Sequence, residues 1–165
     1  MDKLIEKLSE YNILNYLIPG VLFLCFIDAL EIHDINEKNV FLMLFGGYFS
    51  GMVLSRLGSI VVEPLFKWLN IVVYAQYSDY LKAEEKDAKL PRLVSENNMY
   101  RTFVSMFIIL FILYLCGLSV KINYFLHSKC ALFIILLILL LIYILAFRKQ
   151  TSYIRKRVEK INSRG

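Results

Sequence analysis

Two charged side chains within long apolar stretches, Arg56 and Asp28, are the residues of this sequence best placed to do chemistry in a membrane. Burying a lone charge in lipid is costly, so such residues usually contact an ion, a ligand or an opposite charge. Arg56 lies about 9 Å before Val62, the inner end of its stretch, at 1.5 Å per residue, and its long side chain can reach the interface. We therefore predict an interfacial charge, paired with Glu63 or another cytoplasmic carboxylate, or alternatively a gating or ligand contact. Asp28 is predicted to be an interfacial carboxylate, with an ion site as the alternative.

Catalytic and metal-binding motifs are absent from the sequence. It contains no HExxH, GxSxG or Walker A pattern and no clustered set of His, Asp and Glu. The three cysteines, Cys25, Cys116 and Cys130, lack the CxxC or CxxH spacing of a zinc site, and their odd number argues against a disulfide scaffold. We therefore predict that the protein is not an enzyme and has no catalytic residue, cofactor or metal.

A stripe of small residues runs along the second apolar stretch, at Gly47, Gly51, Ser55 and Gly58. Small residues let helix backbones approach closely in lipid, where the hydrophobic effect does not drive helices together. The stripe therefore predicts contact with protein, either a neighbouring helix of the same chain or a second copy at a homo-oligomer axis. Arg56 points about 180° away from Gly47 at 100° per residue, so it should face the cytoplasmic interface instead.

Four apolar stretches must position these residues. The chain has 165 residues, of which 58% are hydrophobic, whereas soluble domains contain about 45–50% apolar residues. Since a membrane span needs about 20 apolar residues, we predict a single all-α domain, residues 1–165: an integral membrane four-helix protein. The predicted spans are Asn12–Leu30, Val40–Val62, Met99–Leu118 and Ala131–Phe147. Pro64 should end or kink the second of them.

Lysine and arginine predict the orientation, because they accumulate on the cytoplasmic side. The N-terminal residues, the loop 63–98, the tail 148–165 and Arg101 together hold 15 of the 19 lysines and arginines, and the loops 33–39 and 119–129 hold three. We therefore expect a multi-pass protein of the bacterial inner membrane with both termini in the cytoplasm.

Two cytoplasmic segments are candidates for contact with a partner or with lipid. The loop 63–98 should contain an amphipathic helix, Leu65–Lys86, which carries the aromatic residues Trp68 and Tyr77. The tail should form a basic helix with apolar residues at i, i+4 and i+7 on one face. The partner or lipid contacts predicted in the tail are Arg155, Lys156, Arg157 and Lys160. Nucleic acid is not an expected partner, because no recognisable binding module accompanies the charge.

The segment Tyr11–Phe23, YNILNYLIPGVLF, resembles the opening of many small bacterial membrane proteins, some of which occur in phage-defence operons. In size, span number and basic tail the chain is also similar to the membrane subunit of the Kiwa system and to transmembrane effectors of cyclic-oligonucleotide and retron defence systems. The resemblance implies a membrane-perturbing or infection-sensing role controlled by a soluble partner. It assigns no function to any single residue.

These observations predict a homo-oligomeric membrane subunit or effector of an anti-phage system, which senses or perturbs the inner membrane together with a soluble partner. The loop 63–98 has 36 residues, fewer than the roughly 40 that a domain needs to fold unaided, so a separate sensing domain is not expected. Two alternatives stay open at this point: a small oligomeric ion channel, and a membrane scaffold or anchor without a pore.

Overall fold

The computed structural model describes residues 11–30, 40–120 and 130–163 of the chain. Of these residues 90% are helical and none lies in a strand, which confirms the predicted all-α class. Three helices are long and apolar enough to cross a membrane, namely Val40–Trp68, Leu90–Cys116 and Leu132–Asn162. They support a multi-pass membrane protein. The predicted loop 33–39 and residues 121–129 of the predicted loop 119–129 lie outside the described ranges.

The first apolar stretch forms a helix that is shorter than the usual thickness of the bilayer core. It consists of a π-helical turn, η1 (Ile13–Leu17), that continues into α2 (Ile18–Ala29). At 1.5 Å per residue, Ile13–Ala29 is about 26 Å long, whereas the hydrocarbon core of a bilayer is about 30 Å thick. The fourth span over Asn12–Leu30 therefore stays a prediction.

The second apolar stretch forms one continuous rod, α3 (Val40–Leu57), η2 (Gly58–Val62) and α4 (Glu63–Trp68). The helix does not end at Pro64, one of the two outcomes predicted there, but continues to Trp68. The π-helical turn η2 precedes Pro64, which then occupies the first turn of α4, where a missing N–H costs little. Pro19 follows η1 in the same way at the start of α2.

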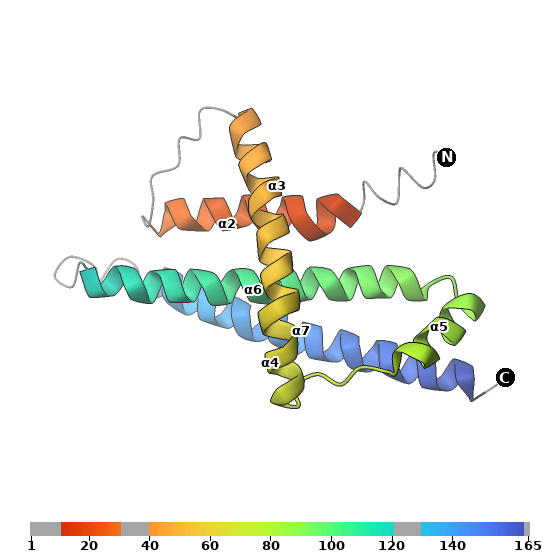
Figure 1. Cartoon of the computed structure of the whole chain (residues 1–165). Coiled ribbons are helices and arrows are strands. Elements are labelled where there is room, and N and C mark those ends of the chain that lie inside the picture. The colour runs from red at the N-terminus through yellow and green to blue at the C-terminus, as the bar shows by residue number, and fades with distance from the viewer. Residues whose placement is uncertain (1–10, 31–39, 121–129, 164–165) are drawn as a thin grey trace.

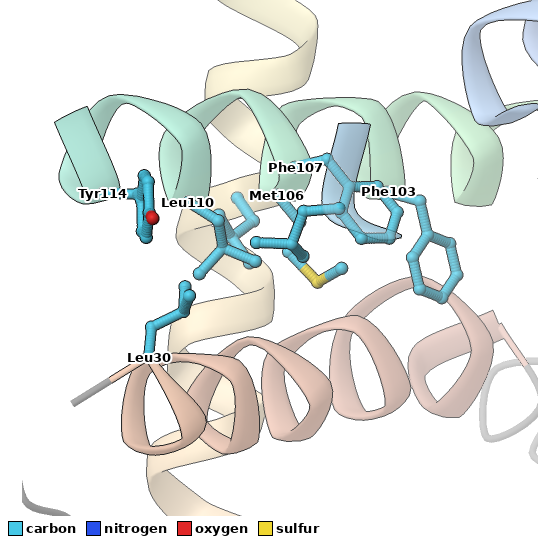
Figure 2. Packing of buried hydrophobic residues seen from close by; sticks show 8 residues of the cluster. Leu30, Phe103, Met106, Phe107, Leu110 and Tyr114 are labelled. Carbon is cyan, nitrogen blue, oxygen red and sulfur yellow. The ribbon is translucent and has the colours of Figure 1, made fainter. Parts of the chain in front are cut away.

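The antiparallel hairpin of α6 (Leu90–Val120) and α7 (Cys130–Asn162) forms the centre of the molecule (Figure 1). Both helices run past their apolar stretches, so the hairpin has an apolar half and a polar half. Stacked rings pack the apolar half: Phe103 lies 4.5 Å from Tyr143 between centroids, and Tyr114 lies 4.8 Å from Phe133. α2 runs in the same direction as α6 and packs against it through Leu30, Met106 and Leu110, which are fully buried (Figure 2).

The rod α3–η2–α4 crosses α2 and α6 instead of running alongside them (Figures 1 and 2). Its contacts are accordingly concentrated at crossing points, where Gly47 and Gly51 meet η1 and α2, and Gly58 meets Arg101 of α6. The predicted spans therefore do not form a bundle of four helices side by side. The glycines permit this arrangement, because backbones without intervening side chains can touch at a crossing.

The single amphipathic helix predicted over Leu65–Lys86 is divided in two by the structure. α4 ends at Trp68, Asn70 adopts a left-handed conformation with φ 56°, and an extended segment leads to α5 (Tyr77–Lys86). Asn tolerates this conformation better than most residues. The break lets Val72 pack into the core with Phe66 and Phe147, so burial of an apolar side chain outweighs the helical preference of the segment.

α5 packs against the polar end of α7. Ala83 of α5 is buried with Ile154 and Val158 of α7, and Asn162 donates a hydrogen bond of 2.9 Å to the Asp79 carbonyl oxygen. The Arg157 Nε atom lies 2.5 Å from the Asp87 carboxylate, just after α5. The apolar face predicted for the tail therefore faces the same chain.

Protonation of Asp87 should loosen this contact. The hydrogen bond from Arg157 and then that from the Lys89 backbone N–H hold the pKa of Asp87 below its ordinary value. The pair therefore stabilises the fold fully above the unfolded-state pKa of about 3.9, and this contribution is lost as the pH falls through the lower folded-state pKa. We expect the thermal midpoints of the wild type and Asp87→Asn to differ by a constant amount above about pH 5 and to converge in stronger acid. A difference that persists at low pH would contradict this role.

Candidate functional site

Two apolar stretches end at a cluster of charged residues that we call the polar junction: Glu63, Lys67 and Arg101. Glu63, at the start of α4, accepts a hydrogen bond from Arg101 of α6, and Lys67 Nζ lies 2.8 Å from its second oxygen. The side chains of Glu63 and Arg101 are only 18% and 13% exposed. Arg101 Nε is buried without a hydrogen bond among the described residues. Two cations thus share one carboxylate, which leaves the junction with one net positive charge.

Tyr74 connects the polar junction to α6 and α7. The Lys67 Nζ atom lies 4.6 Å from the centroid of its ring, within the range of a cation–π interaction. The Tyr74 hydroxyl is buried beside Asn97 and Thr151 and completes no hydrogen bond within the described part of the chain. Burial, and secondarily the Glu63 carboxylate, raise the pKa of Tyr74 to about 12. The hydroxyl therefore keeps its proton at neutral pH and can donate a hydrogen bond.

A cavity of about 340 Å³ opens beside Tyr74, between the extended segment, α5, α6 and α7. Small-molecule sites range from about 300 to 1,000 Å³ and combine apolar walls with a few polar groups. This cavity has that character: its walls are apolar and aromatic, and its polar groups are Lys67, two asparagines and a threonine. The complete lining is Lys67, Tyr74, Ala75, Tyr77, Tyr80, Val94, Asn97, Asn98, Thr151 and Ile154. We call it the junction cavity.

Asn97 and Thr151 form the polar floor of the junction cavity, and both are buried. The Thr151 hydroxyl lies 3.0 Å from Asn97 Oδ1 and 2.9 Å from the Phe147 carbonyl oxygen one turn earlier. This contact joins α6 to α7 and holds the floor in place. On the α5 side, burial and then the Glu84 carboxylate raise the pKa of Tyr80 to about 12, so this hydroxyl is also protonated at neutral pH.

The stripe of small residues on α3 and η2 lies against other helices of the same chain. Gly47 and Gly51 are buried against α2 and η1, Gly58 is buried against Arg101, and Ser55 is 6% exposed. Of the two alternatives, contact within the chain is the one that the structure contains. A homo-oligomer axis along this stripe stays a prediction.

The charged residues singled out in the apolar stretches lie apart from the junction cavity. Arg56 is exposed in the last turn of α3. The expected partner Glu63 binds Arg101 and Lys67 instead, because η2 and α4 place it against α6. Asp28 is half-buried in the last turn of α2.

The predicted partner-contact residues divide into paired and exposed groups. Arg157 binds Asp87, and Arg155 Nε lies 3.1 Å from Glu159 one turn later, so both are engaged within the chain. Lys156 and Lys160 are exposed. Trp68 is 77% exposed and Tyr77 is 75% exposed at the rim of the junction cavity.

The sequence patterns did not identify the polar junction, and of the residues that line the junction cavity they singled out Tyr77 alone. Glu63 and Arg101 were visible only as charges at the ends of two apolar stretches, and the polar floor residues carry no pattern that connects them. Oppositely charged residues at the adjoining ends of two predicted spans are a usable signal, because the predicted topology puts both at the same depth in a membrane. Their pairing could have been proposed on that ground.

Metal coordination is not suggested by the arrangement, since the described residues bring together no group of three or more His, Cys, Asp or Glu side chains that could hold an ion. The arrangement is instead a small amphipathic cavity beside a net positive charge. Comparison with known proteins adds no further constraint: the chain matches no protein-family model, no curated protein and no solved structure.

Proposed function

We propose that the chain is the membrane subunit or effector of a bacterial anti-phage system, a homo-oligomer in the inner membrane that acts with a soluble partner at its polar end. The main support for this proposal is the way in which the polar end of the molecule is held together. α5 is fixed on α7 by an ion pair, a hydrogen bond and a shared apolar core. A small membrane protein thereby presents a defined surface outside its apolar half.

This surface combines exposed aromatic and basic side chains. Trp68 is almost fully exposed at the end of α4, and Lys156 and Lys160 stay exposed after the two neighbouring arginines have paired. Tryptophan and other aromatic residues supply much of the binding energy of protein interfaces, and lysines at the rim attract acidic surfaces. A soluble partner with an apolar pocket and an acidic rim would fit it.

The proposed topology counts the helix of η1 and α2 as the fourth span. An even number of spans puts both termini on the same side, and the excess of lysine and arginine supports the cytoplasm as that side. A helix of about 26 Å can cross if the bilayer thins locally, at a modest energetic cost.

Truncation of Trp68 tests the proposal. Bacteria that carry the chain with its neighbouring genes should survive phage challenge, and Trp68→Ala should abolish protection while the protein stays in the membrane fraction. The matched control is Phe41→Ala, because Phe41 is 80% exposed at the opposite end of the same rod. This variant should protect like the wild type, as measured by plating efficiency.

Three further results would decide against the proposal. A change in membrane potential caused by the chain alone, without its neighbouring genes, would favour the ion channel. Equal protection by Trp68→Ala and the wild type would contradict the proposed partner surface. A monomer in mild detergent would contradict the proposed homo-oligomer.

A further inference from the structure

We propose that the junction cavity binds the phosphate group of an anionic glycerophospholipid. In this complex Lys67 and Tyr74 hold the phosphate, and the apolar wall covers the adjoining glycerol and the start of an acyl chain. The inference concerns a ligand of the membrane itself and is independent of the proposed defence role.

The first support is the depth of the cavity. Its lining begins where the two apolar stretches of the hairpin end: Asn98 directly precedes Met99, and Thr151 lies four residues beyond Phe147. Four residues of helix correspond to about 6 Å. The headgroup layer of one leaflet is about 5–7 Å thick. The cavity therefore lies at the level of the lipid phosphates, where tyrosine is also enriched.

The second support is the charge at the polar junction. Glu63 neutralises only one of the two cations that bind it. The Lys67 side chain is 50% exposed, and an ammonium group has three donors, so two N–H groups stay available beyond the contact with Glu63. A phosphate oxygen would also accept a hydrogen bond from the Tyr74 hydroxyl, which lies beside Asn97 and Thr151 but makes no hydrogen bond of ordinary geometry among the described residues.

The third support is the wall of the cavity. Ala75, Tyr77, Val94 and Ile154 offer apolar and aromatic surface next to the polar groups. A free phosphate ion would leave this surface in water, whereas the glycerol and upper acyl carbons of a lipid would cover it. This favours a lipid over a water-soluble phosphate compound as the source of the phosphate.

Binding can be measured on the full-length protein in mild detergent through the thermal midpoint, because a ligand of the folded state raises it. The probes are dihexanoyl phosphatidylglycerol, dihexanoyl phosphatidylcholine and glycerol 3-phosphate at equal concentrations. Phosphatidylglycerol should raise the midpoint most. Phosphatidylcholine should act more weakly, because its choline cation opposes the charge of the junction, and glycerol 3-phosphate should have no effect.

Two variants and a control locate the site. Lys67→Gln should weaken the binding of phosphatidylglycerol at least about tenfold, since it removes a charge-assisted hydrogen bond. Tyr74→Phe removes one hydroxyl beside Asn97 and Thr151 and keeps the ring in place, so the variant should fold and should bind phosphatidylglycerol several-fold more weakly. Lys82→Gln changes an exposed lysine of α5 outside the cavity lining and should bind like the wild type.

Three outcomes would overturn the proposal. Equal shifts of the thermal midpoint with the two lipids would mean that the positive charge of the polar junction does not contribute to binding. Unchanged binding by Tyr74→Phe would place the lipid elsewhere. A shift with glycerol 3-phosphate that equals that with phosphatidylglycerol would make the cavity a site for soluble phosphate compounds instead.

Discussion

Gly51→Ala should separate η1 from α3 and lower the free energy of unfolding by about 1–3 kcal/mol or more, the usual range for overpacking a core. A Cβ atom at this position would lie 1.8 Å from the Tyr16 carbonyl oxygen. The obstacle is backbone, which cannot move aside as a flexible side chain could. The two helices must therefore separate, although alanine by itself favours a helix by about 1 kcal/mol over glycine. Thermal unfolding in detergent and faster amide hydrogen exchange across residues 13–29 would show the effect.

Gly46→Ala is the matched control, because it makes the same substitution one position before the stripe. A Cβ atom there would lie 3.6 Å from the Leu24 side chain, an ordinary van der Waals contact. This variant should be neutral or up to about 1 kcal/mol more stable. Equal behaviour of the two variants would show that the crossing of α3 with η1 and α2 does not hold the fold together.

The crossing point also shows how far the sequence alone could predict this fold. Apolar stretches and a stripe of small residues are local patterns, so the long helices and the close contact of Gly47 and Gly51 could be predicted from them. The direction of the rod relative to α6 depends on which surface meets the stripe. That surface includes Gly20, where an added Cβ atom would lie 1.7 Å from the Gly47 carbonyl oxygen. Because Gly20 lies in another helix, no periodicity in α3 could identify it.

The candidate site was harder to predict for the same reason. The segment Leu65–Lys86 has the composition of an amphipathic helix, but burial of Val72 and the left-handed Asn70 break it in two. That break creates the extended wall of the junction cavity. The floor brings Asn97 to Thr151 across the hairpin, a pairing that depends on the register of α6 and α7. Arg56, a charge that stands out in the sequence, does not line the junction cavity.

Glu63→Gln should be the most damaging single change at the polar junction. The substitution keeps the shape of the side chain but leaves Arg101 and Lys67 without the carboxylate that they share. Removal of one partner from a buried ion pair costs about 3–5 kcal/mol, and the small residual exposure of Arg101 places the expected loss near the lower end. The measurement is chemical or thermal unfolding of the purified protein, followed through its one tryptophan, Trp68, at the end of α4.

Two comparisons identify the cause of that loss. Glu159→Gln makes the same chemical change in an exposed pair with Arg155 and should cost at most about 1 kcal/mol. Arg101→Gln should cost less than Glu63→Gln, because Lys67 still neutralises Glu63 in that variant, whereas Glu63→Gln leaves two cations facing each other. If Arg101→Gln proves equally damaging, the contact between α4 and α6 depends on the packing of the arginine side chain, and the charge of the junction has no part in the stability of the crossing.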